Sequence, residues 1–380
     1  MPSLYVHIPF CEKKCLYCDF YSIENLSSVD QFLSSLHCEI DLHAPYGDGV
    51  AFETVFFGGG TPSLLQPDQL EGILSHLRAV YDVRPDAEIT VETNPGTVTP
   101  DKLRAFKSLG ITRLSIGIQS FHDDELKFLS RIHDREEALR CVGFARDAGF
   151  DNLNIDLMYS LPGQSPDRWK SNLVQAVALG TEHISAYSLI VEDNTPLARM
   201  VAAKQVSPNP VETEAAMYEL TMEFLCGQGF EHYEVSNYAR SGFRSRHNYN
   251  YWNHENYLSF GPSAHSFWRQ AGSGFGVRWW NIANISHYCD RLQDGNPPLV
   301  TREFVRTREL MNERVFLGLR SDGLNMKRFE EEFGVTLTSS HGATIRQLVD
   351  EQYAEMNDDH LRLTSKGFLL CDEISARLLP

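Results

Sequence analysis

Apolar runs and amphipathic stretches alternate over the first 230 residues of the chain. Segments with helical period, such as DQLEGILSHLRAVY (68–81) and EEALRCVGFARDAG (136–149), follow runs with the composition of strands. Those runs are SLYVHIP (3–9), FETVFFGGG (52–60), EITVETNP (88–95), RLSIGIQS (113–120), NLNIDLMYS (152–160) and HISAYSLIVE (183–192). Strict alternation of strand and helix predicts parallel strands joined by crossover helices. Six such units predict an α/β fold, a partial (β/α)6 barrel of the TIM type.

The rest of the chain follows other patterns. Residues 231–300 are dense in aromatic residues, His and Asn, which predicts a connecting or binding segment. In 301–380, TREFVRTRELMNERVFLGLR (301–320) and MKRFEEEFG (326–334) have helical patterns, and MNDDHLRLTSKGFLLCDEI (356–374) predicts a hairpin that enters a final helix. We therefore expect three parts: a barrel at 1–230, a connecting segment at 231–300 and a winged-helix-like domain at 301–380.

Local signals mark the ends of some helices. In TPDKLRAFKSLG (99–110), Thr99 is a candidate N-cap, Pro100 fits the first turn and Gly110 fits a C-terminal stop. These three residues predict one complete helix between the third and fourth strands.

Charge and composition narrow the possible partners and compartment. The net charge is −17, and residues 301–380 carry eleven Lys and Arg against fourteen Asp and Glu, so nucleic acid is not an expected partner. No stretch is apolar enough to span a bilayer, and MPSLYVHIPF does not have the pattern of a signal peptide. Five of the eight cysteines are scattered singly, which does not suggest a disulfide framework. We expect a cytoplasmic protein.

Three cysteines, Cys11, Cys15 and Cys18, lie within eight residues directly after the first predicted strand. Thiolates hold iron–sulfur clusters, and three of them would leave one iron of a four-iron cluster open to an exchangeable ligand. A zinc ion with His7 or Asp19 as fourth ligand is an alternative, as is chance clustering.

Other polar residues follow the strands at the end where barrel enzymes place their sites. They are Gly58–Gly60, Glu92, Gln119, Arg131 and Asp156. The glycine triplet has no following Lys, so it is not a phosphate loop, and its backbone allows close approach of a ligand. Each of these residues also has a plain structural reading, as a tight turn or a hydrogen-bonded polar group. Together they predict one polar rim.

These motifs bear a resemblance to a known family. YVHIPFCEKKCLYCDF, FFGGGTPS, VETNP and LSIGIQSF with Arg131 resemble the radical S-adenosylmethionine proteins, in the branch around oxygen-independent coproporphyrinogen III oxidase. The resemblance implies a 4Fe–4S cluster on Cys11, Cys15 and Cys18. It implies S-adenosylmethionine at Tyr5, Gly59 and Glu92, and a second such molecule at Tyr17, Gly60, Thr61, Gln119, Arg131 and Asp156. It also implies an electron donor.

A second motif, HNYNYW at 247–252, fits the H-N-x-x-Y-W signature of the HemW-type haem chaperones. That resemblance implies haem as a ligand and haem-accepting proteins, such as respiratory enzymes, as partners. His247 is the expected iron ligand, and Arg244 and Arg246 are candidates for pairing with haem propionates. The alternatives are a packed aromatic loop with a hydrogen-bonded His247, or another histidine as ligand, namely His232, His254 or His265.

Three functions follow from these patterns. The first is a haem chaperone that binds a 4Fe–4S cluster with exchangeable S-adenosylmethionine and transfers haem to acceptor proteins. The second is oxygen-independent coproporphyrinogen III oxidase, an enzyme of porphyrin biosynthesis. That oxidase carries a further cysteine where this chain has Phe20, and a long segment before the stretch that begins here at Tyr5. The third is a structural zinc protein. Whether the chain is itself an enzyme stays open.

Overall fold

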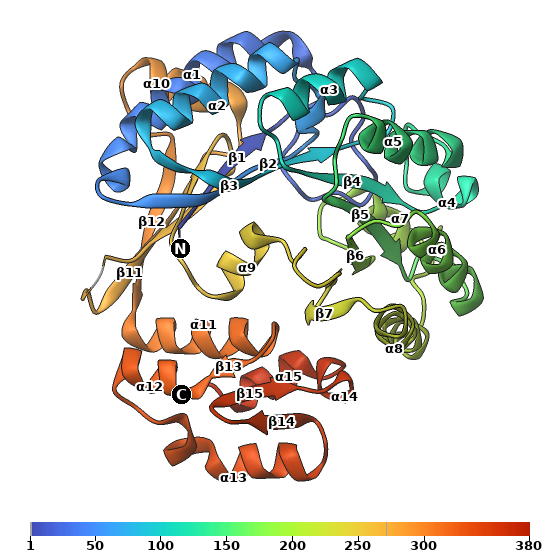
Figure 1. Ribbon diagram of the computed structural model, residues 1–380, viewed down its shortest axis with the longest axis vertical. Helices are drawn as coiled ribbons and strands as arrows, with labels where there is room; N and C mark the ends of the chain where they lie inside the picture. The colour runs from blue at the N-terminus through green and yellow to red at the C-terminus, as the bar shows by residue number, and fades with distance from the viewer. Residues whose placement is uncertain (1, 271) are drawn as a thin grey trace.

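The computed structural model describes residues 2–270 and 272–380, and its barrel has the predicted strand order (Figure 1). Successive strands from β1 to β6 pair in parallel, each with the next along the chain. These strands are β1 (Ser3–Ile8), β2 (Ala51–Gly59), β3 (Asp82–Thr93), β4 (Arg113–Gln119), β5 (Leu153–Tyr159) and β6 (His183–Ser188). The partial (β/α)6 barrel expected from the alternating pattern is therefore confirmed.

Helices cover the outer side of this curved sheet (Figure 1). They are α1 (Val29–Leu42), α2 (Pro67–Val80), α3 (Pro100–Ser108), α4 (Asp123–Phe128), α5 (Arg135–Asp147), α6 (Pro166–Ala178) and α8 (Val211–Gly227). The short helix α7 (Pro196–Ala202) instead begins beside residues 11–18, where the Leu197 amide donates to Leu16 O at 3.0 Å. The connections also contain the 3-10 turns η1 (Leu26–Ser28), η2 (Ala44–Gly47) and η3 (Pro62–Leu64). The signals for α3 are confirmed. The Thr99 hydroxyl accepts a bond from the Lys102 amide at 3.3 Å, and Gly110 follows the helix with φ of +85°.

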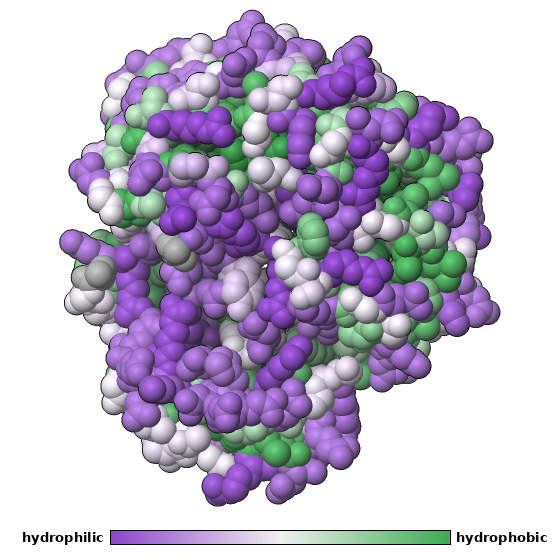
Figure 2. All heavy atoms as spheres, in the orientation of Figure 1, coloured by the Kyte–Doolittle hydropathy of each residue, from purple (hydrophilic) through white to green (hydrophobic). Residues whose placement is uncertain are grey.

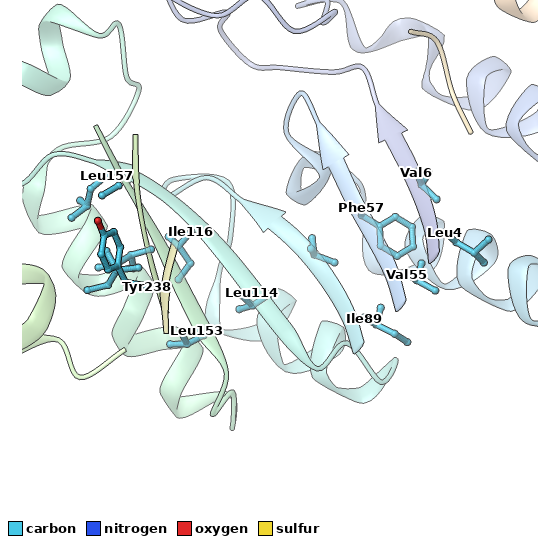
Figure 3. Packing of buried hydrophobic residues seen from close by; sticks show 14 of the residues in the cluster. Leu4, Val6, Val55, Phe57, Ile89, Leu114, Ile116, Leu153, Leu157 and Tyr238 are labelled. Atoms are coloured by element: carbon cyan, nitrogen blue, oxygen red, sulfur yellow. The ribbon is translucent and has the colours of Figure 1, made fainter. Parts of the chain in front are cut away.

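The barrel strands have two different faces. Alternate residues such as Leu4, Val55 and Leu114 are completely buried and pack in one apolar cluster, shown from close by in Figure 3. Because successive side chains of a strand point to opposite faces, the residues between them face the inside of the barrel. Those inner residues include Tyr5 and Ser115, which line a cavity. The apolar outer face therefore holds the helices, and the inner face is free to carry polar groups.

Residues 231–300 extend this sheet at both of its ends. The segment and its continuation contribute β7 (Glu231–Glu234), β8 (Asn237–Ala239), β9 (Tyr257–Phe260), β10 (His265–Trp268), β11 (Phe275–Asn281) and β12 (Leu299–Arg306), with helices α9 (Arg246–Trp252) and α10 (Ile285–Gln293). The result is a twelve-stranded sheet in the order β12-β11-β10-β9-β1-β2-β3-β4-β5-β6-β8-β7. Four of these strands, β7 to β10, have only three or four residues, which is too few to show alternation in the sequence. The expected boundaries at 230 and 300 mark changes of pattern within one sheet, and the division stays a prediction.

The C-terminal part has the expected helices and hairpin, with one correction. Its elements are α11 (Thr307–Leu319), β13 (Leu324–Asn325), α12 (Met326–Phe333), α13 (Leu337–Asp350), β14 (Ala354–Asn357), β15 (His360–Leu363), α14 (Ser365–Phe368) and α15 (Cys371–Arg377). A small sheet in the order β13-β15-β14 packs with these helices, which confirms a winged-helix-like unit. Residues 301–306 were expected to be helical but belong to β12, because they pair antiparallel with β11. No helix within 2–270 and 272–380 is long and apolar enough to cross a membrane, and the face seen in Figure 2 is mostly hydrophilic.

A buried carboxylate fastens α1 to the added strands. Glu39 is completely buried, and its oxygens accept bonds from the Gly261 amide at 2.7 Å, the Tyr288 hydroxyl at 2.6 Å and the Asn281 side-chain amide at 2.6 Å. Burial raises the pKa of Glu39 to about 7, although all three donors favour the ionised form. One side chain thus joins α1, α10 and the ends of β9 and β11.

We expect the substitution Glu39→Ala to destabilise the protein by about 3 kcal/mol, because it leaves three buried donors without an acceptor. Urea unfolding measures this as a lower midpoint at unchanged slope. Glu71→Ala on the exposed side of α2 is the matched control, with an expected change of less than about 0.5 kcal/mol. Equal midpoints for the two variants would contradict the role of Glu39.

Candidate functional site

One cavity of about 610 Å³ collects the residues that the sequence singled out. Its walls come from the barrel strands, the cysteine loop between β1 and α1, and α9. The residues expected to hold the cluster, S-adenosylmethionine and haem iron all line it, namely Tyr5, Cys11, Cys15, Tyr17, Cys18, Gly59, Gly60, Thr61, Glu92, Gln119, Arg131, Asp156 and His247. Their separate positions along the chain thus converge on one place, and their individual roles stay predictions.

The cysteine loop is closed at its base by main-chain hydrogen bonds. The Cys11 amide donates to Ile23 O at 2.9 Å, and the Ile23 amide donates to Pro9 O at 2.8 Å. On the other side, the amides of Gly60 and Thr61 donate to Ile8 O at 2.8 Å and Phe10 O at 2.7 Å. The base of the loop is therefore held between Ile23, where the chain returns from the loop, and the residues that follow β2.

Two polar side chains approach the thiols. The Thr61 hydroxyl lies 3.6 Å from the Cys11 sulfur, and Arg131 Nη1 lies 3.5 Å from the Cys15 sulfur. Burial raises the pKa of Cys18 to about 11, so a bound cation is needed to hold this thiol ionised at neutral pH. The three cysteine sulfurs therefore fit a cluster of metal ions, whose positive charge would stabilise the thiolate forms.

A single metal ion fits these residues less well. Among residues 2–270 and 272–380, no three His, Cys, Asp or Glu side chains are grouped as ligands for one ion. His7, the alternative fourth ligand for zinc, is buried, and its Nε2 lies 2.8 Å from Tyr21 O. Three thiols spread along one loop instead suit separate corners of a larger cluster.

The glycine triplet is required by close packing. A Cβ at Gly60 would lie 2.5 Å from Phe10 O, and one at Gly59 would lie 2.6 Å from the His7 ring. Gly59 also has φ of +106°, which favours glycine. The triplet thus allows the end of β2 to press against the base of the cysteine loop, and the Gly59 amide donates to Glu92 at 3.2 Å.

Two partly buried carboxyl groups, those of Glu92 and Asp156, lie on the inner face of the barrel. Burial raises the pKa of Glu92 to about 8, with a further contribution from the charge of Asp156. Burial likewise raises the pKa of Asp156, which is bonded by Asn154 at 2.7 Å and Ser115 at 3.2 Å. A ligand ammonium beside Glu92 would favour its ionised form, so this position suits an amino acid moiety.

Arg131 joins the cysteine loop to the strands. Its Nη2 donates to Asn94 Oδ1 and to Gly117 O, both at 2.6 Å, and its Nη1 faces the Cys15 sulfur. Its Nε is buried without a hydrogen-bond partner. Gln119 nearby has φ of +70°, an unusual value for a residue other than glycine and one often found at functional sites.

His247 on α9 is buried against β2. Its Nδ1 lies 2.7 Å from the Thr54 hydroxyl, its Nε2 lies 3.0 Å from the Tyr251 hydroxyl, and its ring stacks on Phe56 at a centroid distance of 4.8 Å. Burial lowers the pKa of His247 to about 3, so its imidazole is neutral at physiological pH. Neutral imidazole is the form that binds iron.

Arg244 and Arg246 do not line the cavity and are bonded elsewhere. Arg244 pairs with Glu231 and Asp322, each at 3.1 Å, and Arg246 approaches Glu53 at 3.5 Å. The alternative histidines also lie outside the cavity. His232 stacks on Tyr238, His254 pairs with Glu313 and His265 stacks on Trp280.

The cavity also contains inner-face residues that the sequence patterns did not single out. They are Asn94, Arg113, Ser115, Asn154, Ser185 and Tyr187. The signal that could have found most of them is the alternation within each strand, because polar residues there occupy every second position between aliphatic ones.

Comparison with known proteins finds the Radical SAM superfamily over residues 5–173 and the HemN C-terminal domain over residues 306–370. The chain is 36% identical to the haem chaperone HemW of Bacillus subtilis, over 100% of this chain and 99% of that protein. It is 39% identical to HemW of Escherichia coli over 69% of each.

Among solved structures, coproporphyrinogen III oxidase (HemN) from Escherichia coli superposes with a TM-score of 0.83 at 23% identity, covering 100% of this chain and 90% of that one. This likeness confirms the fold. The 36% identity to the haem chaperone of Bacillus subtilis extends over the whole chain and therefore also shows the family. The chain belongs to the HemW family within the radical S-adenosylmethionine superfamily.

Proposed function

We propose that the protein is a haem chaperone that binds haem and transfers it to acceptor proteins. One observation carries this proposal: the H-N-x-x-Y-W signature of α9 and the three cysteines after β1 line the same cavity. The relative from Bacillus subtilis, named as a haem chaperone, matches over the full chain, which supports the same function.

Membership of the superfamily implies a 4Fe–4S cluster and S-adenosylmethionine. We propose that Cys11, Cys15 and Cys18 hold the cluster and that Glu92, with Gly59, receives the amino group of S-adenosylmethionine. When both are bound, the reduced cluster would supply one electron that cleaves a carbon–sulfur bond of S-adenosylmethionine. The chain itself supplies polar groups that hold the cysteine loop and orient the ligand through Arg131 and Asp156.

We propose that His247 provides the nitrogen ligand to haem iron. The hydrogen bond between Nδ1 and Thr54 fixes the ring, as outer partners of metal-bound histidines do. Nε2 becomes available once the Tyr251 hydroxyl rotates away, which costs one hydrogen bond of about 1 kcal/mol. Phe56 and Tyr251 offer aromatic surface to a flat macrocycle.

The first test concerns the cluster. We expect Cys15→Ala to lose the brown thiolate-to-iron absorbance and most of the iron after anaerobic reconstitution, because one corner of the cluster loses its ligand. Cys38→Ala, on the exposed side of α1, is the matched control and should keep both. A full complement of iron and sulfide in Cys15→Ala would refute the assignment.

The second test concerns haem. We expect His247→Ala to weaken haem binding by about tenfold or more and to shift the Soret band, while the iron–sulfur cluster persists. His265→Ala removes an exposed histidine outside the cavity and should leave haem binding unchanged. The opposite result, with an effect only in His265→Ala, would move the ligand to that position.

The third test separates delivery from catalysis. Haem-loaded protein mixed with a haem-free acceptor should lose its Soret absorbance as the acceptor gains it. The same reconstituted protein should convert little coproporphyrinogen III and should not rescue a strain that lacks the oxygen-independent oxidase. Robust conversion without haem transfer would favour the oxidase function instead.

A further inference from the structure

Arg113 is a charged side chain in the interior of the barrel that the proposed mechanism does not use. It begins β4, only 1% of its surface is exposed, and it lines the cavity. Its backbone pairs with Thr90, whereas Glu92 pairs with Ser115. Arg113 therefore lies one inward-facing position, about 7 Å, farther from the C-terminal strand ends than Glu92.

The guanidinium of Arg113 has no anionic partner among the described residues. No carboxylate oxygen of these residues comes within 4.0 Å of its nitrogens, and its Nε is buried without a hydrogen bond. The charge of Arg113 opposes the rise that burial causes in the pKa of Glu92 and Asp156, but neither carboxyl group lies within 4.0 Å of its nitrogens to form an ion pair. A buried cation without a partner is strongly unfavourable, so the pocket is incomplete without an anion.

The other cations that line the cavity are committed or lie at its rim. Arg131 is bonded to Asn94 and Gly117 O. Lys14 donates to Phe20 O at 2.9 Å, and Lys13 is exposed on the cysteine loop. Arg113 is thus the buried cation with donors to spare, and its planar fork matches a carboxylate.

We infer that Arg113 binds a carboxylate of the molecule in the cavity, either a propionate of haem or the carboxylate of S-adenosylmethionine. Only the haem alternative rests on the proposed function. For haem, Arg113 would neutralise a propionate deep in the barrel; for S-adenosylmethionine, it would approach from below the carboxylate whose neighbouring amino group faces Glu92. His247, whose pKa is lowered in part by the charge of Arg113, lies on the same inner wall.

The test compares each ligand with an analogue that lacks the charge. Haem is paired with haem dimethyl ester, and S-adenosylmethionine with decarboxylated S-adenosylmethionine, by equilibrium titration of the anaerobically reconstituted full chain. We expect the wild-type protein to prefer the acid by about tenfold to a hundredfold in at least one pair, as a charge-assisted bidentate contact would. In Arg113→Gln that preference should fall to within about threefold, with affinity for the neutral analogue unchanged.

Two further variants serve as controls. Arg104→Gln, on the surface of α3, should keep the wild-type preferences. Arg113→Lys keeps the charge but loses the fork, so it should show an intermediate preference, and it replaces Arg113→Gln if that variant fails to fold.

Lost preference in the haem pair assigns Arg113 to a propionate, and lost preference in the other pair assigns it to S-adenosylmethionine. Wild-type preferences that persist in both pairs would overturn the inference. A wild-type chain that binds no haem would refute the proposed function, while the S-adenosylmethionine pair would still test Arg113.

Discussion

The six parallel strands of the barrel pack their apolar outer face against helices, and their polar inner face lines the cavity. Leu4, Val55 and Leu114 seal the contact between sheet and helices, and this burial supplies the hydrophobic stabilisation of the fold. The inner positions are consequently free to be polar. Those that are buried, such as Thr90, Arg113, Asn154 and His183, need a hydrogen-bond partner or a ligand. His183, for example, lies between Asn154 and Tyr233, at 2.5 Å and 2.7 Å.

Helix α9 completes this polar interior. The amides of Arg246 and His247 at its beginning both donate to the Glu88 carboxylate at 3.2 Å, so the helix is anchored to β3. On its other side the Tyr249 hydroxyl donates to Asp322 at 2.8 Å, next to the end of α11. The signature segment therefore connects the barrel interior with the C-terminal unit.

Local patterns predicted most of the fold and much of the site. The strand positions and the cap at Thr99 depend on a few neighbouring residues, and the three cysteines form a motif within one loop. The role of β12 and the surroundings of His247 depend instead on distant pairing. Thr54 and His247 are 193 residues apart, and no local pattern records that contact. The sequence likewise did not predict a role for Arg113, because only the folded structure shows that no carboxylate of the described residues pairs with it.

The main-chain bonds at the base of the cysteine loop have a consequence for maintenance of the protein. Ile23, Pro9, Gly60 and Thr61 hold the loop through peptide groups, without help from the sulfur atoms. If oxygen destroyed an iron–sulfur cluster bound to this loop, the main-chain bonds at the base of the loop would remain. A cell could refit the same polypeptide in place rather than degrade it and synthesise another.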